Sequence, residues 1–262
     1  MNNHPIGIFD SGVGGTSIWK EINALLPNED TIYLADSKNA PYGEKSKNEI
    51  VQLSIKNTNL LLDKGCKLIV VACNTATTNA IDYLRNNYNL PFIGIEPAIK
   101  PAALQSQSKT VGVLATKGTL SSGLFHSTSE NHAYGIRIIE QVGTGLVPLI
   151  ESGKVNSQET KALLATYLKP MLIAGIDYLV LGCTHYPYLI PVLEDILPKN
   201  VKIIDSGEAV ARQTKAVLGK NDLFTGSNEK GYHQFITNTD VGVLESFLKD
   251  YNSTIKTTYQ DF

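Results

Sequence analysis

The chain has 262 residues, of which 42% are hydrophobic and 18% charged, a composition typical of a globular protein with a sizeable core. The formal net charge of -2 gives no bulk basic character, which argues against a nucleic-acid partner. No apolar run approaches the ~20 residues of a membrane helix, and we see no signal peptide. Three cysteines are too few for a disulfide framework, so we expect a cytoplasmic protein with reduced thiols and no membrane partner.

Strand-like and helical stretches alternate from the start of the chain. Short apolar runs predict buried strands, and amphipathic stretches predict helices. Ser46 and Glu49 form a capping box that begins one helix, and Gly65 is a plausible stop for it. The predicted elements are a strand at 6–9 followed by a glycine-rich turn, a helix at 17–26, the helix from residue 46, a strand at 68–72, a helix at 75–85 and a strand at 92–95.

The same order recurs in the second part of the chain. The predicted elements are a strand at 111–114, a stretch at 146–152 that leads to a helix, and strands at 178–182 and 202–204. Asn156, with Glu159 three residues on, predicts the N-cap of that helix, and Pro170 should kink or end it. The C-terminal stretch contains a strand candidate at 234–237 and a short helix after Asp240, and we expect it to pack on the first domain.

The two parts also align with each other. Residues 7–11 resemble 112–116, residues 70–75 resemble 180–185, and residues 93–96 loosely resemble 203–205, at offsets of 105 to 110 residues. Any two strand-turn-helix units look somewhat alike, but order and spacing both repeat, which favours one duplicated unit. We therefore predict two similar α/β domains, 1–96 plus 206–262 and 97–205. Their parallel sheets would be related by pseudo-twofold symmetry, with the active site in the cleft between them.

Cys73 and Cys183 each end an apolar strand and precede a polar residue at the start of a helix or turn. Ligands of parallel α/β sheets bind outside the carboxyl ends of the strands. The N–H groups and partial positive charge of a helix N-terminus favour a thiolate. Buried cysteines are often merely small hydrophobic residues, but two at equivalent positions of a repeat indicate function. Cys66 has no repeat partner, so we interpret it as structural.

A pair of acid/base groups suits one particular chemistry. Inverting a stereocentre by proton transfer requires removal of the proton on one face and delivery on the other. Two groups on opposite sides of a planar carbanion can do this, and two similar domains place one on each side. A carbanion beside a carboxylate also needs dense hydrogen-bond donation to that carboxylate, which helix N-termini supply.

Four motifs resemble those of the glutamate racemases, within the aspartate/glutamate racemase family. They are the N-terminal signature at 9–15, the substrate-binding loop Pro41-Tyr42-Gly43, and the two catalytic motifs at 72–76 and 182–187. The match runs in order from residue 6 to about residue 212. It implies interconversion of L- and D-glutamate without pyridoxal phosphate or any other cofactor, with D-glutamate supplying peptidoglycan synthesis, and it favours a homodimer.

The resemblance also implies roles for individual residues. Cys73 would take the α-proton from D-glutamate with the help of Asp10, and Cys183 would take it from L-glutamate with the help of His185. Glu151 matches a family glutamate near the Cys183 side. The positions implied to bind substrate are Asp10, Ser11, Pro41, Tyr42, Gly43, Cys73, Asn74, Thr75, Thr184 and His185.

Several of these residues also have a structural interpretation. Asp10 precedes a glycine-rich turn and would cap the next helix, and Asn74 and Thr75 are good N-cap types. His185 would be a satisfied structural histidine, although its place near the second cysteine favours function. Glu151 beside a helix would ordinarily be solvated, so its selection depends on the resemblance alone.

Some classes of site are disfavoured, and some alternatives stay open. The turn at 10–15 fits neither a Rossmann fingerprint nor a Walker motif, so its glycines would let the backbone approach a small ligand. No second Cys/His pair has zinc spacing, and we predict no metal. The alternatives are a related racemase acting on aspartate or a hydantoin, a non-catalytic small-molecule binding protein, and a phosphate-binding transferase.

Overall fold

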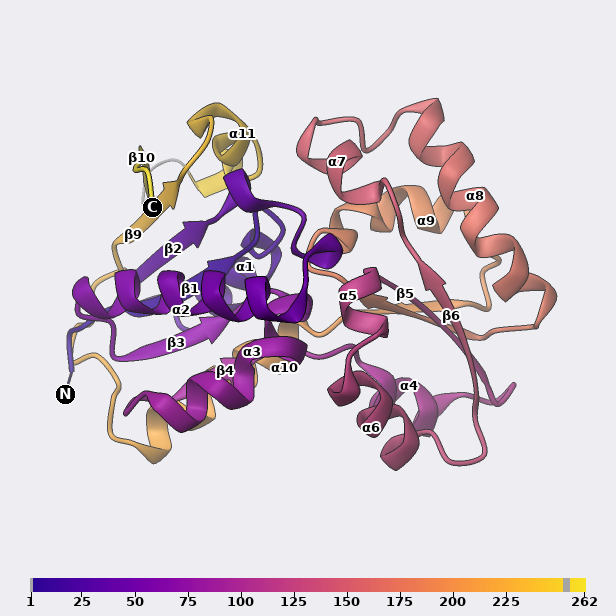
Figure 1. Cartoon of the computed structure of the whole chain (residues 1–262), viewed down its shortest axis with the longest axis horizontal. Coiled ribbons are helices and arrows are strands. Elements are labelled where there is room, and N and C mark those ends of the chain that lie inside the picture. The colour runs from indigo at the N-terminus through magenta and orange to yellow at the C-terminus, as the bar shows by residue number, and fades with distance from the viewer. Residues whose placement is uncertain (1, 252–254) are drawn as a thin grey trace. The chain divides into compact units, whose positions relative to one another are not determined.

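The computed structural model describes residues 2–251 and 255–262; residues 1 and 252–254, which the sequence assigns to the first domain, lie outside the described part. The chain divides into two compact units (Figure 1). Unit 1 comprises Met1–Ile95 and Gly207–Phe262, and unit 2 comprises Glu96–Ser206. Each unit is a parallel β-sheet with helices, so the predicted α/β class with two similar parallel-sheet domains is confirmed.

The sheet of unit 1 has six strands in the order β10-β9-β2-β1-β3-β4, all parallel. The strands are β1 (Ile6–Asp10), β2 (Thr31–Ala35), β3 (Leu68–Val71), β4 (Phe92–Gly94), β9 (His233–Thr237) and β10 (Ile255–Tyr259). The helices are α1 (Thr16–Leu25), α2 (Lys47–Asp63), α3 (Asn74–Asn87), α10 (Gly207–Lys220) and α11 (Val241–Ser246), with 3-10 turns at Ser37–Asn39, Tyr42–Glu44 and Lys249–Tyr251.

The sheet of unit 2 has four parallel strands in the order β6-β5-β7-β8. The strands are β5 (Thr110–Ala115), β6 (Arg137–Val142), β7 (Tyr178–Gly182) and β8 (Lys202–Ile204). The helices are α4 (Ile99–Gln105), α5 (Lys117–Leu120), α6 (Gly123–His132), α7 (Leu146–Glu151), α8 (Gln158–Ile173) and α9 (Ile190–Ile196), with a 3-10 turn at Tyr186–Leu189.

The internal repeat is visible in strand order and register. The order β2-β1-β3-β4 in unit 1 recurs as β6-β5-β7-β8 in unit 2. Ile8 of β1 pairs with Val70 of β3, and Val113 of β5 pairs with Val180 of β7. These four residues are equivalent in the sequence alignment of the two halves, so the cysteines that follow β3 and β7 occupy matching positions.

The loosest part of that alignment is wrong by one residue. Ile93 of β4 pairs with Val70, whereas the residue that pairs with Val180 is Ile204 of β8. Ile204, and not Ile203, is therefore the counterpart of Ile93. Both strands are only three residues long, which gives the sequence little pattern from which to fix a register.

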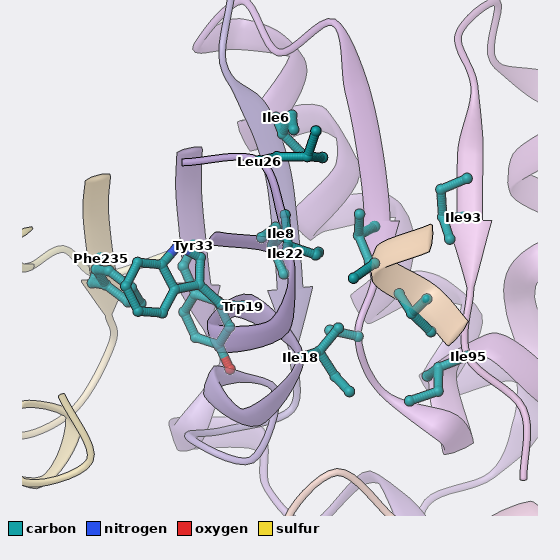
Figure 2. Packing of buried hydrophobic residues seen from close by; sticks show 14 of the residues in the cluster. Ile6, Ile8, Ile18, Trp19, Ile22, Leu26, Tyr33, Ile93, Ile95 and Phe235 are labelled. Atoms are coloured by element: carbon teal, nitrogen blue, oxygen red, sulfur yellow. The ribbon is translucent and has the colours of Figure 1, made fainter. Parts of the chain in front are cut away.

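The core of unit 1 contains a cluster of buried apolar residues from helices α1 and α10 and from the sheet strands (Figure 2). Trp19, Tyr33 and Phe235 gather at one end, with the Trp19 and Phe235 ring centroids 4.8 Å apart in an edge-on arrangement. The Trp19 indole Nε1 donates to Thr31 Oγ1 at 2.9 Å, and this hydroxyl lies 3.0 Å from His233 Nδ1. Burial of the indole therefore leaves its N–H group satisfied.

Local signals explain the starts of helices α2 and α8, and one predicted cap needs correction. The Ser46–Glu49 capping box of α2 is present, as predicted. The N-cap of α8 is Ser157, whose Oγ accepts from the Thr160 N–H at 3.1 Å, so the prediction of Asn156 is wrong by one residue. Pro170 lies inside α8, which continues to Ile173. Proline lacks the N–H group that would donate to the Thr166 carbonyl, so one hydrogen bond is lost and the helix continues past it.

The C-terminal stretch joins the sheet of unit 1. The predicted strand is β9, which pairs with β2 in register from Thr31 opposite His233 to Ala35 opposite Thr237. The predicted short helix is α11, with Asp240 as its N-cap. Strand β10, which the sequence did not predict, pairs with β9 at the sheet edge. Within the described ranges, none of the helices has the length and apolar character needed to cross a bilayer.

Candidate active site

Unit 1 brings Asp10, Ser11 and Cys73 together at the carboxyl edge of its sheet. Asp10 is the last residue of β1, and Cys73 comes two residues after the end of the neighbouring strand β3. The Cys73 thiol lies 3.7 Å from Ser11 Oγ, which in turn lies 3.5 Å from Asp10 Oδ1. All three residues are at least nine-tenths buried. A thiol, a hydroxyl and a carboxylate thus form one continuous polar group.

The glycine-rich turn holds the Asp10 carboxylate in place. The Gly15 N–H donates to Asp10 Oδ2 at 2.6 Å, and the Tyr33 hydroxyl donates to the Gly12 carbonyl at 2.8 Å. A Cβ at Gly15 would lie 2.8 Å from both Asp10 Cβ and Tyr33 Oη. At Gly15, therefore, the lack of a side chain permits close packing inside the protein. The N-cap of α1 is Gly15 and not Asp10, but the Asp10 carboxylate accepts the N–H group of that N-cap residue.

Cys73 itself is the N-cap of α3. Its Sγ accepts from the Ala76 N–H at 3.5 Å, and the backbone of Cys73 is extended while Asn74 begins the helix. Asn74 and Thr75, which are better N-cap types by composition, occupy the first helical turn instead. The sulfur therefore sits at the positive end of a 14-residue helix, where both the N–H group and the helix dipole favour a thiolate.

Asn74 has the clearest unused binding capacity in unit 1. Its side chain is buried, yet neither the amide nitrogen nor the amide oxygen has a hydrogen-bond partner among the described residues. A buried amide without a partner costs free energy, which is seldom tolerated without a functional reason. Thr75 beside it is also buried. The Asn74 amide is thus suited to bind a polar ligand next to Cys73.

The segment Pro41-Tyr42-Gly43 follows β2 and contains a cis Ala40–Pro41 peptide bond. Tyr42 is 1% exposed, and its hydroxyl donates to Asp36 Oδ2 at 2.6 Å and accepts from Asn57 Nδ2 at 3.0 Å. Burial, then the Asp36 carboxylate, then Cys73 raise the pKa of Tyr42 well above its usual value. The phenol therefore remains a neutral donor, within electrostatic range of Cys73.

Unit 2 brings Cys183, His185 and Glu151 together. Cys183 immediately follows β7, and its Sγ lies 3.8 Å from His185 Nδ1. His185 Nε2 lies 2.7 Å from Oε1 of Glu151, the last residue of α7. The Glu151 side chain is 19% exposed and the His185 side chain 2% exposed. Glu151 is thus paired with a buried imidazole, and Thr184 is buried beside it.

The partners of His185 determine its protonation. Burial lowers the pKa of the imidazole, but the hydrogen bonds and charges of Cys183 and Glu151 outweigh burial and raise the pKa well above its usual value. An imidazolium 3.8 Å from the sulfur would stabilise a thiolate at Cys183. This thiol is followed by a turn and the 3-10 helix Tyr186–Leu189. The prediction that a helix or a turn follows each cysteine is therefore met by an α-helix at Cys73 and by a turn at Cys183.

Cys66 is buried, and burial raises the pKa of its thiol to about 12, so it is held as a neutral thiol. Its Sγ would lie 3.0 Å from a Cβ at Gly7. Over residues 2–251 and 255–262, no group of three or more His, Cys, Asp or Glu side chains is arranged to hold a metal ion. Sequence reasoning missed Asp36, which has no motif of its own.

These geometries define a class of protein. Each unit holds a cysteine at the carboxyl end of an equivalent strand. Cys73 is linked through Ser11 to the Asp10 carboxylate. Cys183 lies beside the imidazole of His185, which is paired with a carboxylate. Such groups carry out acid/base proton transfer. The chain belongs to the Asp/Glu/Hydantoin racemase family, whose profile matches residues 6–214. It is therefore an enzyme, and the alternatives of a non-catalytic binding protein and of a phosphate-binding transferase are wrong.

The chain is similar to glutamate racemases of several bacteria. A glutamate racemase of Herpetosiphon aurantiacus is 47% identical over 92% of this chain and 94% of its own. The structure of Escherichia coli glutamate racemase, in complex with L-glutamate and the activator UDP-MurNAc-ala, is similar with a TM-score of 0.86 and 33% identity, over 98% of this chain and 97% of that one. The glutamate racemase of Francisella tularensis, in complex with D-glutamate, has a TM-score of 0.85 and 29% identity, over 100% and 98%.

Proposed function

We propose that this racemase interconverts L- and D-glutamate by a two-base mechanism without a cofactor, with Cys73 and Cys183 as the bases. The observation that carries the proposal is the pair of equivalent strand ends, β3 and β7, each followed by a cysteine with its own polar partner. Family membership supports racemisation, and the names of the relatives support glutamate as substrate.

Each cysteine exchanges one proton with the α-carbon during racemisation. In the D-to-L direction the Cys73 thiolate removes the α-proton of D-glutamate and becomes a thiol. The C–H electron pair remains on the α-carbon as a carbanion stabilised by the adjacent carboxylate. The Cys183 thiol then delivers its proton to the opposite face and becomes a thiolate. The L-to-D direction exchanges the two roles, and proton exchange with solvent restores the starting state.

The partners of each thiol follow from the contacts. In this proposal the Cys73 thiol donates a hydrogen bond to the Ser11 hydroxyl, which donates to the Asp10 carboxylate, and this chain of hydrogen bonds helps Cys73 to give up its proton. The His185–Glu151 pair stabilises the Cys183 thiolate. The N-terminus of α3 favours negative charge at Cys73 and at a bound carboxylate. The residues proposed to bind substrate are Asp10, Ser11, Pro41, Tyr42, Gly43, Cys73, Asn74, Thr75, Thr184 and His185.

The choice of glutamate over aspartate or a hydantoin is tested by direct assay. Circular dichroism of each pure enantiomer should show loss of signal with glutamate. Turnover with aspartate or a hydantoin should be absent or far slower. Faster racemisation of aspartate than of glutamate would contradict the proposed substrate and leave the racemase class intact.

The cysteine roles are tested with three matched substitutions. Cys73→Ser and Cys183→Ser should each abolish racemisation, because a serine hydroxyl is far too weak an acid to replace the thiol. Cys66→Ser is the control, since its buried neutral thiol lies at the other end of β3, beside Leu68. Normal racemisation by either active-site variant, with native circular dichroism, would contradict the two-cysteine mechanism.

The resemblance extends the proposal to the cell. We propose a cytoplasmic homodimer that supplies D-glutamate for peptidoglycan synthesis. Sedimentation analysis should give about twice the 28.5 kDa chain mass. Deletion of the gene should make growth depend on added D-glutamate, and growth without it in the absence of another source would contradict the role.

A further inference from the structure

Asp36 is a fully buried carboxylate at the carboxyl edge of the unit 1 sheet. It follows the last residue of β2, and its backbone N–H donates to the Asp10 carbonyl at 3.0 Å. Its side chain is 0% exposed. Burial of a carboxylate is unfavourable unless donors compensate it, and apolar packing would often stabilise the fold equally well. The position therefore calls for an explanation beyond stability.

Four side chains from three segments of the chain donate to this carboxylate. Oδ1 accepts from Asn39 at 2.8 Å and Asn238 at 2.6 Å, and Oδ2 accepts from Tyr42 at 2.6 Å. Lys56 Nζ lies 3.1 Å from both oxygens. Asp36 is thus the point at which the loop after β2, helix α2 and the C-terminal stretch meet.

One of these donors belongs to the segment proposed to bind substrate. The Tyr42 hydroxyl has the donor Asn57 on one side and the acceptor Asp36 on the other, which fixes its hydrogen-bond direction. Gly43 follows directly in the chain. An anchored phenol therefore fixes the backbone of Pro41-Tyr42-Gly43 from the side of the protein interior.

The C-terminal residues complete the anchor. Asn238, directly after β9, accepts the Lys38 N–H at 2.9 Å and donates to Asp36. Lys56 Nζ donates to the Phe262 carbonyl oxygen at 3.1 Å and lies 5.1 Å from the centre of the Phe262 ring. The stretch for which the sequence offered no motif thus contacts the same carboxylate as the substrate-binding segment.

We propose that Asp36 is a positioning residue for racemisation: it holds Tyr42, and with it Pro41-Tyr42-Gly43, in the geometry that binds glutamate, and the C-terminal stretch acts on substrate affinity through it. The inference rests on the proposed glutamate racemase function. Asp36 contacts no reacting atom, so its effect falls on substrate affinity more than on the chemical step.

The test is steady-state kinetics with a double-mutant cycle. Asp36→Asn should raise KM for glutamate roughly ten- to a hundredfold, because one to two charge-assisted hydrogen bonds are lost. The same variant should change kcat by less than about threefold. Tyr42→Phe should also raise KM, and the double variant should be little worse than the more severe single variant, because both break the same contact. Additive effects, or an unchanged KM in Asp36→Asn, would overturn the inference.

Two further variants separate positioning from general damage. Asp30→Asn changes a carboxylate at the opposite end of the same strand, where Oδ1 accepts the Tyr232 N–H at 2.7 Å, and should leave KM unchanged. If Asp36→Asn does not fold, Asn238→Ala decides: it removes one donor, and KM should rise several-fold, whereas an unchanged KM overturns the inference. Failure of the wild type to racemise glutamate would instead reject the proposed function.

Discussion

Replacement of Glu151 by glutamine tests the electrostatic support of Cys183. The carboxylate lies 2.7 Å from the buried His185 Nε2, and it is one of the groups that raise the imidazole pKa. Glutamine keeps an acceptor of the same shape but removes the charge. A hydrogen bond to a charged group is worth about 1.5–3 kcal/mol, against about 0.5–1.5 for a neutral one. The difference, about 1–1.5 kcal/mol, corresponds to about one pKa unit or a tenfold change in rate.

We therefore expect kcat/KM of Glu151→Gln to fall about tenfold in a circular dichroism assay. It must fall by the same factor for both enantiomers, because their equilibrium constant is one. The imidazolium form is lost as pH rises through its pKa, and the variant lowers that pKa. The alkaline limb of the pH–rate profile should consequently move about one unit towards lower pH.

The free energy of unfolding should also decrease as pH rises through the pKa of His185. A histidine whose folded-state pKa is raised contributes stability that is fully present below about pH 6.5 and is lost as pH rises through the folded-state pKa. Glu159→Gln is the matched control, because the Glu159 side chain is exposed and forms a 3.8 Å surface pair with Lys154. A Glu151→Gln enzyme with kcat/KM within twofold of the wild type and an unmoved pH profile would refute this reasoning.

Three further predictions concern stability and substrate affinity. Burial lowers the pKa of His233 to about 4, so the free energy of unfolding should fall by about 3 kcal/mol as pH drops from about 6.5 to 4. In urea titrations, His233→Gln should remove this pH dependence of the free energy of unfolding. An unchanged pH dependence in the variant would contradict the prediction. Gly15→Ala should lower the free energy of unfolding by about 1–3 kcal/mol and reduce activity, because the new Cβ meets Asp10, whereas Gly123→Ala, with open space around it, should do neither. Asn74→Ala should leave stability unchanged or higher while KM rises, since the amide has no partner among the described residues, and a stability loss without a KM change would argue against a ligand-binding amide.

The sequence predicted the parts of the fold that local pattern controls. Unbroken apolar runs identified β1, β3, β5 and β7, and the alignment of Gly7 with Gly112 placed both cysteines after equivalent strands. Strand β10, with its partly exposed face, has no such run. Its place beside β9 is set by sheet pairing, which local pattern does not encode.

Helix caps show the limit of residue-type preference. Asn74 and Thr75 are better N-cap types than cysteine, yet the helix begins one residue earlier, with the Cys73 sulfur as acceptor. At α8 the shift is in the other direction, because Ser157, one residue after Asn156, is the residue whose side chain accepts the Thr160 N–H. A preference averaged over many proteins does not resolve a shift of one residue.

Site residues were predictable where a motif or a repeat marked them. Glu151 was selected by resemblance alone, and only the folded chain reveals its contact with His185, 34 residues away. Asp36 had no signal at all, because its donors come from as far along the chain as Asn238. Contacts of this range depend on tertiary packing, and no local pattern predicts them.

The most direct test of the two-cysteine mechanism is α-deuterium exchange in heavy water with the single-cysteine variants. Wild-type enzyme should form product labelled at the α-carbon from either enantiomer. Cys183→Ser, which keeps Cys73, should exchange the α-proton of D-glutamate only, and Cys73→Ser should exchange that of L-glutamate only, with no inversion in either case. Exchange of both enantiomers by one variant, or racemisation without label, would contradict a mechanism in which each cysteine serves one face.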